Sequence, residues 1–219
     1  MSVAMATTKW RLPAVTRRNL LRCLVAGYLV FCALYLGSAA LAIRAPQLLE
    51  PSSLDRAAPF MAASIWVYLS QFVLLPYALA STRDDAVRSR AFYSMLVATA
   101  IAALVFMLFP TRVPRAVAPA DGLLGLVWHA LHLADTPNNA FPSLHVALAA
   151  LAGATLWHSD RRVAALVWPV LIAASALTTR QHVAWDVAGG LLLAPLAWFL
   201  TPRLIPYERT LAPDYAAVR

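Results

Sequence analysis

Six long apolar segments constrain the fold of this chain more than any other feature of its sequence. They cover residues 23–43, 57–80, 91–109, 143–157, 163–179 and 183–200. A helix needs about 20 apolar residues to cross the hydrocarbon layer of a membrane. Only 13% of the 219 residues are charged, against about 25% in a soluble domain. The sequence therefore predicts an all-α fold, a polytopic membrane helix bundle with six transmembrane helices.

The same segments predict how the chain is divided. No repeat or low-complexity tract interrupts them, so we expect one membrane domain over residues 23–201, with a basic tail before it (1–22) and a second tail after it (202–219). The basic stretch before residue 23 leads into a full-length span and lacks the usual small-residue cleavage site of a signal peptide. The first span is therefore expected to remain in the mature protein.

The distribution of positive charge predicts the orientation. The net charge is +8, yet alternate loops hold 13 of the 18 Lys and Arg residues. Loops rich in Lys and Arg lie on the cytoplasmic side of a membrane, so both termini are expected inside. This pattern predicts that the basic loops face a lipid bilayer and that the protein has no nucleic-acid partner. We expect a location such as a bacterial inner membrane or its equivalent.

The loop over residues 110–142 is too long for a simple connection. It contains DGLLGLVWHALHL (121–133), in which polar and apolar residues separate onto two faces of a helix. We expect an interfacial helix here, lying in the membrane surface or folded over a site.

Two histidines and an aspartate are expected to meet on the outer side. The fourth and fifth spans form a hairpin, so His145 at its start and His182 just after its end return to one membrane depth. Asp186 follows His182 by four residues, which places both on one helical face. A carboxylate there can accept the Nδ1 proton and leave Nε2 as a nucleophile or a base. Without further context, either histidine could instead be structural.

Three arginines lie near these groups in the predicted topology, namely Arg112, Arg115 and Arg180. The forked guanidinium suits the oxygens of a phosphate. Two histidines, a carboxylate and three arginines therefore predict a phosphate site.

Three short motifs now carry a resemblance. FPTRVPR (109–115), PSLH (142–145) and HVAWD (182–186) follow in the order and at the membrane side found in the type 2 phosphatidic acid phosphatase superfamily, which the chain resembles. FPSLH, QH before the aspartate and AGG after it are more similar to the branch that includes inositol phosphorylceramide synthases. The resemblance covers roughly residues 109–190.

The resemblance implies a role for each candidate residue. His182 would attack phosphorus and form a phosphohistidine, Asp186 would orient it, and His145 would protonate the leaving alkoxide. The transition-state charge would be stabilised by five groups: the side chains of Arg115, Arg180 and Arg112, and the backbone amides of Ser143 and Leu144 at a helix N-terminus. No metal and no cofactor is expected.

Two positions depart from the superfamily pattern. Leu108 stands where the first motif usually has lysine, and Ala176 stands where the third motif usually has arginine. The loss of two cations bears on the substrate more than on the class of reaction.

Three functions remain open from the sequence. The first is an integral membrane phosphatase that acts on a lipid phosphate or a polyprenyl diphosphate. The second is a lipid headgroup phosphotransferase, in which an alcohol replaces water. The third is a transporter or scaffold, which the near absence of charge inside the spans disfavours.

Overall fold

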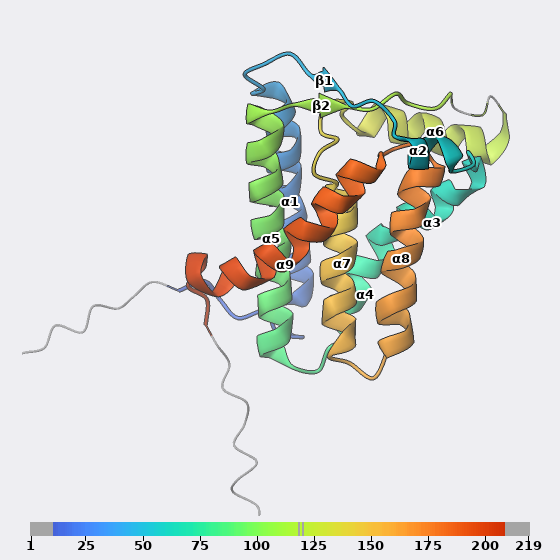
Figure 1. The fold of residues 1–219 in the computed structure, drawn as a ribbon. Helices are drawn as coiled ribbons and strands as arrows, with labels where there is room; N and C mark the ends of the chain where they lie inside the picture. The colour runs from blue at the N-terminus through green and yellow to red at the C-terminus, as the bar shows by residue number, and fades with distance from the viewer. Residues whose placement is uncertain (1–10, 118, 120, 209–219) are drawn as a thin grey trace, which may run out of the picture.

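The computed structural model describes residues 11–117, 119 and 121–208, and these residues are mostly helical (Figure 1). The predicted all-α class is therefore confirmed. In chain order the elements are α1 (Leu20–Ala40), β1 (Gln47–Leu48), α2 (Ser53–Ala57), the 3-10 helix η1 (Ala62–Ser64), α3 (Ile65–Leu69), α4 (Gln71–Ser81), α5 (Asp85–Leu108), β2 (Thr111–Arg112), α6 (Gly122–Ala134), α7 (Leu144–Trp157), α8 (Arg162–Thr178) and α9 (Ala184–Leu204).

Four helical segments are long and apolar enough to cross a membrane: α1, the continuous segment Ala62–Ser81, α5 and α9. Helices α7 and α8 are apolar but have only 14 and 17 residues. At 1.5 Å per residue they extend about 21 and 26 Å, less than the ~30 Å of a hydrocarbon core. Four candidate spans are thus present among the described residues. That α7 and α8, the fourth and fifth predicted spans, also cross the membrane remains a prediction.

The second predicted span, residues 57–80, begins later than expected. Helix α2 ends at Ala57, and the apolar helical segment starts again only at Ala62. Between them Ala58 is extended, with φ −68° and ψ 125°, because the residue before a proline disfavours helical geometry. Pro59 therefore lies in a connection rather than within a span.

Helices α1, α5, α7 and α8 stand side by side, α9 crosses them obliquely, and α6 lies across one end (Figure 1). We call this end, where β1 and β2 also lie, the α6 end. The chain reaches it at the end of α5 and again at the start of α9. Helices α7 and α8 must therefore form the hairpin that leads away from the α6 end and back.

The two limits of the described chain meet at the opposite end of the bundle. The amide of Leu12 donates to the carbonyl of Pro206 at 2.8 Å, and the amide of Glu208 donates to the carbonyl of Leu12 at 2.9 Å. The ring of Tyr207 stacks on Tyr93 of α5, with centroids 5.2 Å apart. Parts of both predicted tails are thus packed on the bundle, whereas residues 1–10 and 209–219 lie outside the described residues.

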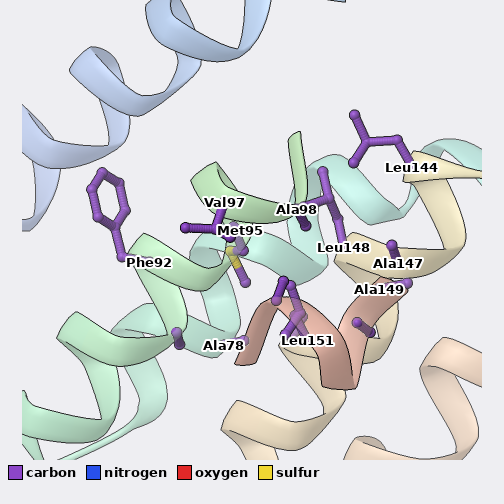
Figure 2. Packing of buried hydrophobic residues seen from close by; sticks show 14 of the residues in the cluster. Ala78, Phe92, Met95, Val97, Ala98, Leu144, Ala147, Leu148, Ala149 and Leu151 are labelled. Atoms are coloured by element: carbon purple, nitrogen blue, oxygen red, sulfur yellow. The ribbon is translucent and has the colours of Figure 1, made fainter. Parts of the chain in front are cut away.

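Helix α7 forms the centre of the core. It packs against α4, α5, α8 and α9, and Leu148 and Leu151 project from it among the side chains of α5 (Figure 2). Small residues allow the close approach of helices in a membrane. A Cβ added at Gly153 would lie 2.6 Å from the carbonyl oxygen of Ala165 on α8, and one at Gly190 of α9 would lie 2.4 Å from that of Ser143. Gly153 thus allows α8 to lie close to the second half of α7, and Gly190 allows α9 to lie close to its start.

The α6 end is closed by short contacts among distant segments. Strands β1 and β2 pair in parallel, with Gln47 opposite Thr111, and Thr111 also bridges to Asn139 just before α7. The expected helix at residues 121–133 is present as α6. Its Trp128 is fully buried and donates from Nε1 to the carbonyl of Ala62 at 3.1 Å. Helix α6 is therefore attached to the bundle above the start of α7.

Candidate active site

His145 lies in the first turn of α7. The hydroxyl of Ser143 caps this helix by accepting from the amide of Val146 at 3.3 Å. The His145 ring stacks on the ring of Tyr68, with centroids 3.7 Å apart, and its Nε2 lies 2.6 Å from the Tyr68 carbonyl oxygen. A carbonyl oxygen can only accept, so Nε2 carries a proton in this arrangement. Nδ1 is then the ring nitrogen left to exchange a proton with a ligand.

His182 lies two residues before α9 begins, and Asp186 lies in the first turn of that helix. The His182 Nδ1 is 3.3 Å from the Asp186 Oδ2, which also accepts from the amide of Val183 at 3.1 Å. Asp186 is completely buried. The predicted pair is present, although His182 belongs to the connection before the helix and not to a shared helical face. With its proton on Nδ1, His182 has a lone pair on Nε2.

One cavity of about 480 Å³ joins these groups. His145, His182 and Arg115 all line it, together with Leu144 and Gln181. The three residues come from the start of α7, the connection before α9 and the connection after β2. The α7–α8 hairpin thus brings the two histidines to one cavity.

Arg115 is held by a carboxylate that sequence reasoning did not select. Its Nη2 lies 2.8 Å from the Asp135 Oδ2, and its guanidinium also donates to the backbone carbonyls of His132 and Asp135. The Tyr35 hydroxyl donates to the other oxygen of Asp135. Asp135 is the C-cap residue that follows α6. Its place between the first and second motifs was the one feature of the sequence that could have pointed to it. The Arg115 Nε has no partner among the described residues and remains a free donor.

The other two predicted arginines do not line the cavity. Arg112 is exposed in β2, where its carbonyl accepts from the amide of Leu49 at 2.8 Å. Arg180 is exposed and has a left-handed backbone, with φ 53°. The expectation that all three arginines gather on one ligand is corrected by this placement: Arg112 and Arg180 stand at the α6 end, outside the cavity.

The two predicted backbone donors also separate. The amide of Ser143 donates to the carbonyl of Asp186 at 3.0 Å, so it is engaged in joining α7 to α9 and is not free for a ligand. The amide of Leu144 has no acceptor among the described residues, and Leu144 lines the cavity. Only the second donor keeps its predicted availability.

Four cavity residues carry buried polar atoms that lack a partner within the described chain. They are the Gln71 Oε1, Thr136 Oγ1, Asn139 Oδ1 and Gln181 Nε2. Buried polar atoms are nearly always hydrogen-bonded, to protein or to water. The cavity can therefore bind a polar ligand or ordered water at these atoms.

Within the described residues, no three His, Cys, Asp or Glu side chains are grouped so that they could hold a metal ion. His129 is exposed on α6. Burial lowers the pKa of His132 below its ordinary value, and the neighbouring Arg115 charge acts in the same direction. His132 therefore stays neutral near pH 7 and adds no cation beside Arg115.

The fold and the site define a helical membrane protein with a histidine–aspartate pair, a second histidine and an arginine at one cavity. The family model described as the PAP2 superfamily matches residues 32–200, from α1 to α9. The chain belongs to the PAP2 superfamily, as its motifs indicated, and this membership indicates a phosphatase-type function. A search among curated proteins and a search among solved structures each gave no match.

Proposed function

We propose that this protein is an integral membrane phosphatase that releases phosphate from a lipid phosphate or a polyprenyl diphosphate through a phosphohistidine at His182. One observation carries the proposal: His182, with Asp186 at its Nδ1, opens on the same cavity as His145 and Arg115. A nucleophile, its orienting carboxylate, a second proton-transfer group and a cation are what phosphoryl transfer through histidine requires.

In the first step the lone pair of the His182 Nε2 attacks phosphorus. The N–P bond forms while the ester P–O bond breaks, and the imidazole becomes positively charged. Asp186 accepts the Nδ1 proton as a hydrogen bond and balances this charge without taking the proton. Since Asp186 is completely buried, its charge is only weakly screened by water.

The leaving alkoxide receives a proton from His145. Because the Nε2–H is held by the Tyr68 carbonyl, the proton comes from Nδ1 of the doubly protonated ring. In the second step neutral His145 takes a proton from water at the same Nδ1. The water oxygen then attacks phosphorus, the N–P bond breaks, and phosphate leaves with His182 restored.

Phosphate oxygens are bound by the free Nε of Arg115 and by the Leu144 amide at the N-terminus of α7. Asp135 keeps the Arg115 guanidinium in place through its 2.8 Å ion pair. Arg112 and Arg180 attract the anionic headgroup from the rim instead of touching the reacting phosphate.

A second candidate function is a lipid headgroup phosphotransferase of the inositol phosphorylceramide synthase kind. The buried acceptors Gln71 Oε1 and Asn139 Oδ1 each need a hydrogen-bond donor, which a fully ionised phosphate does not supply. A headgroup or acceptor alcohol with two or more hydroxyls can donate to both. This observation favours an acceptor alcohol, or a substrate whose headgroup carries hydroxyls.

We further propose that α7 and α8 complete a six-span topology with the site on the outer side. The loops at the end opposite α6 hold most of the basic residues, which supports a cytoplasmic location for that end and for both termini. The α6 end, including the cavity mouth, then faces outward, with α6 at the membrane interface.

The test is a lipid panel presented to the full-length protein in nanodiscs. Lipid phosphomonoesters, a polyprenyl diphosphate and a phosphoalcohol lipid are supplied, with and without an acceptor alcohol. Phosphate release measures hydrolysis, and mass spectrometry of the lipids measures transfer. Release that disappears in His182→Ala supports the phosphatase. A new headgroup lipid without release supports the phosphotransferase, and equal turnover in His182→Ala contradicts both.

A further inference from the structure

The cavity at the histidines does not end at the polar groups. It continues into the bundle between α1, α4 and α5 as a channel with apolar walls, which we call the apolar slot. Six residues define it: Gly27 and Phe31 of α1, Leu75 and Leu79 of α4, and Phe92 and Leu96 of α5. We call the part of the cavity at His145, His182 and Arg115 the polar compartment. The polar compartment and the apolar slot thus share one continuous volume.

The slot runs along helix α1. Tyr35 near the polar compartment and Leu24 near the opposite end both line the cavity. They are eleven residues apart on α1, which corresponds to about 16 Å along the helix axis. The slot therefore extends over about half of the ~30 Å hydrocarbon core of a bilayer.

The slot opens toward lipid between α1 and α4. Tyr28 of α1 and Phe72 of α4 both line the cavity, yet they are 59% and 56% exposed. Helix α1 packs mainly on α5 and buries only Gly27 and Ser38 of its own residues. A hydrocarbon chain can therefore enter sideways while its headgroup stays at the α6 end.

The inner end of the slot is closed by a contact between α1 and α5. Phe92 projects from α5 toward α1 (Figure 2), and its ring would lie 2.7 Å from a Cβ added at Gly27. The Phe92 ring fits against α1 because Gly27 has no side chain. The pair Gly27 and Phe92 therefore lies at the inner end of the open volume, about one turn from Leu24, the lining residue of α1 that is furthest from the α6 end.

We propose that the apolar slot holds one extended hydrocarbon chain of the substrate, and that Gly27 and Phe92 set the longest chain that fits. The inference rests on the proposed function, since it places the phosphate at His182. A chain that leaves the bilayer for the slot gains little hydrophobic free energy, because lipid tails are as apolar as the slot. Selection therefore comes from fit, and an overlong chain must displace Phe92 or buckle.

The first test shortens the slot with Gly27→Leu. Alkyl phosphates from hexyl to hexadecyl are hydrolysed in nanodiscs of fixed lipid composition, and kcat/KM of the variant is divided by that of the wild type at each length. Partition into the bilayer cancels in this ratio. We expect a ratio near one for hexyl and a fall of about fivefold to 150-fold for hexadecyl, the range that overpacking produces.

Matched variants separate slot filling from other effects. Gly37→Leu is the control on α1, since a Cβ there meets nothing within 4 Å and Gly37 does not line the cavity. Leu75→Trp fills the slot from the opposite wall, and exposed Val73 on the same helix gives the control Val73→Trp. Leu75→Trp should reproduce the length-dependent loss, whereas neither control should. If Gly27→Leu fails to fold, Leu75→Trp decides alone.

Failure of the slot and failure of the phosphatase are distinguishable. Losses that are equal at all chain lengths, or equal in the controls, overturn the slot while hydrolysis by the wild type still stands. Alkyl phosphonates, which cannot be hydrolysed, test binding without turnover. If the wild type hydrolyses nothing but binds phosphonates with a length limit that Leu75→Trp shortens, the slot stands and the phosphatase is wrong.

Discussion

Replacing Asp186 with asparagine isolates the charge that balances His182. Asparagine can put its oxygen where Oδ2 lies and so keep the hydrogen bonds from Val183 and His182. Its amide nitrogen then occupies the position of Oδ1, which already lacks a partner among the described residues. The local structure is therefore preserved while one buried negative charge is removed.

The expected size of the effect follows from the distance. Two unit charges separated by the 3.3 Å between the His182 Nδ1 and the Asp186 Oδ2 attract by about 5 kcal/mol at an effective dielectric constant of about 20. This charge pair exists only when His182 becomes cationic as it attacks phosphorus. Every 1.36 kcal/mol is about tenfold in rate, and the retained amide dipole keeps part of the stabilisation. We expect Asp186→Asn to slow phosphorylation by about 1,000-fold.

Rapid-quench measurement of the acid-labile phosphoenzyme reports this step directly. Asp55→Asn is the matched control, because the Asp55 Oδ1 accepts from the amide of Ala184 at 2.7 Å, at the same helix N-terminus but without contacting His182. It should cost about 0.5–1 kcal/mol of stability and change the rate less than threefold by comparison. If Asp186→Asn stays within threefold of the wild type, or loses no more than Asp55→Asn, the Asp186 charge does not stabilise the transition state.

Four further outcomes are expected. His145→Ala should slow phosphoenzyme formation, measured by rapid quench, by about 100-fold to 10,000-fold on an alkyl phosphate and much less on a nitrophenyl phosphate, whose leaving group needs no proton; equal losses in this step would mean that His145 does not protonate the leaving group. EDTA should leave turnover unchanged, and loss that a divalent ion restores would contradict the phosphohistidine. In a cysteine-free background, an impermeant maleimide added outside should label Arg180→Cys but not Arg161→Cys, and the reverse pattern would overturn the topology. Arg88 is fully buried and donates from Nε to the carbonyl of Leu79 at 2.8 Å, so Arg88→Met should lower the free energy of unfolding by about 3 kcal/mol; an unchanged unfolding midpoint in denaturant would contradict this.

Local patterns predicted the helices well because burial in a membrane depends on the composition of each segment. The boundaries moved where a local contact intervened. Helix α5 begins at Asp85, six residues before the predicted residue 91, because the Asp84 side chain accepts from the amides of Ala86 and Val87 and caps it. Pro59 delayed the second span for the opposite reason, since it prevents helical geometry at the residue before it.

Motif order and spacings of a few residues were enough to indicate the superfamily, the hairpin that returns His145 and His182 to one end, and the pairing of His182 with Asp186. Three other features could be seen only in the folded protein: Asp135 holds Arg115, Arg112 and Arg180 stay outside the cavity, and an apolar slot continues from the site. Those features join segments far apart in the chain. Their contacts depend on the path of each connection and on how side chains from different helices fill the space between them, which no local pattern of residues encodes.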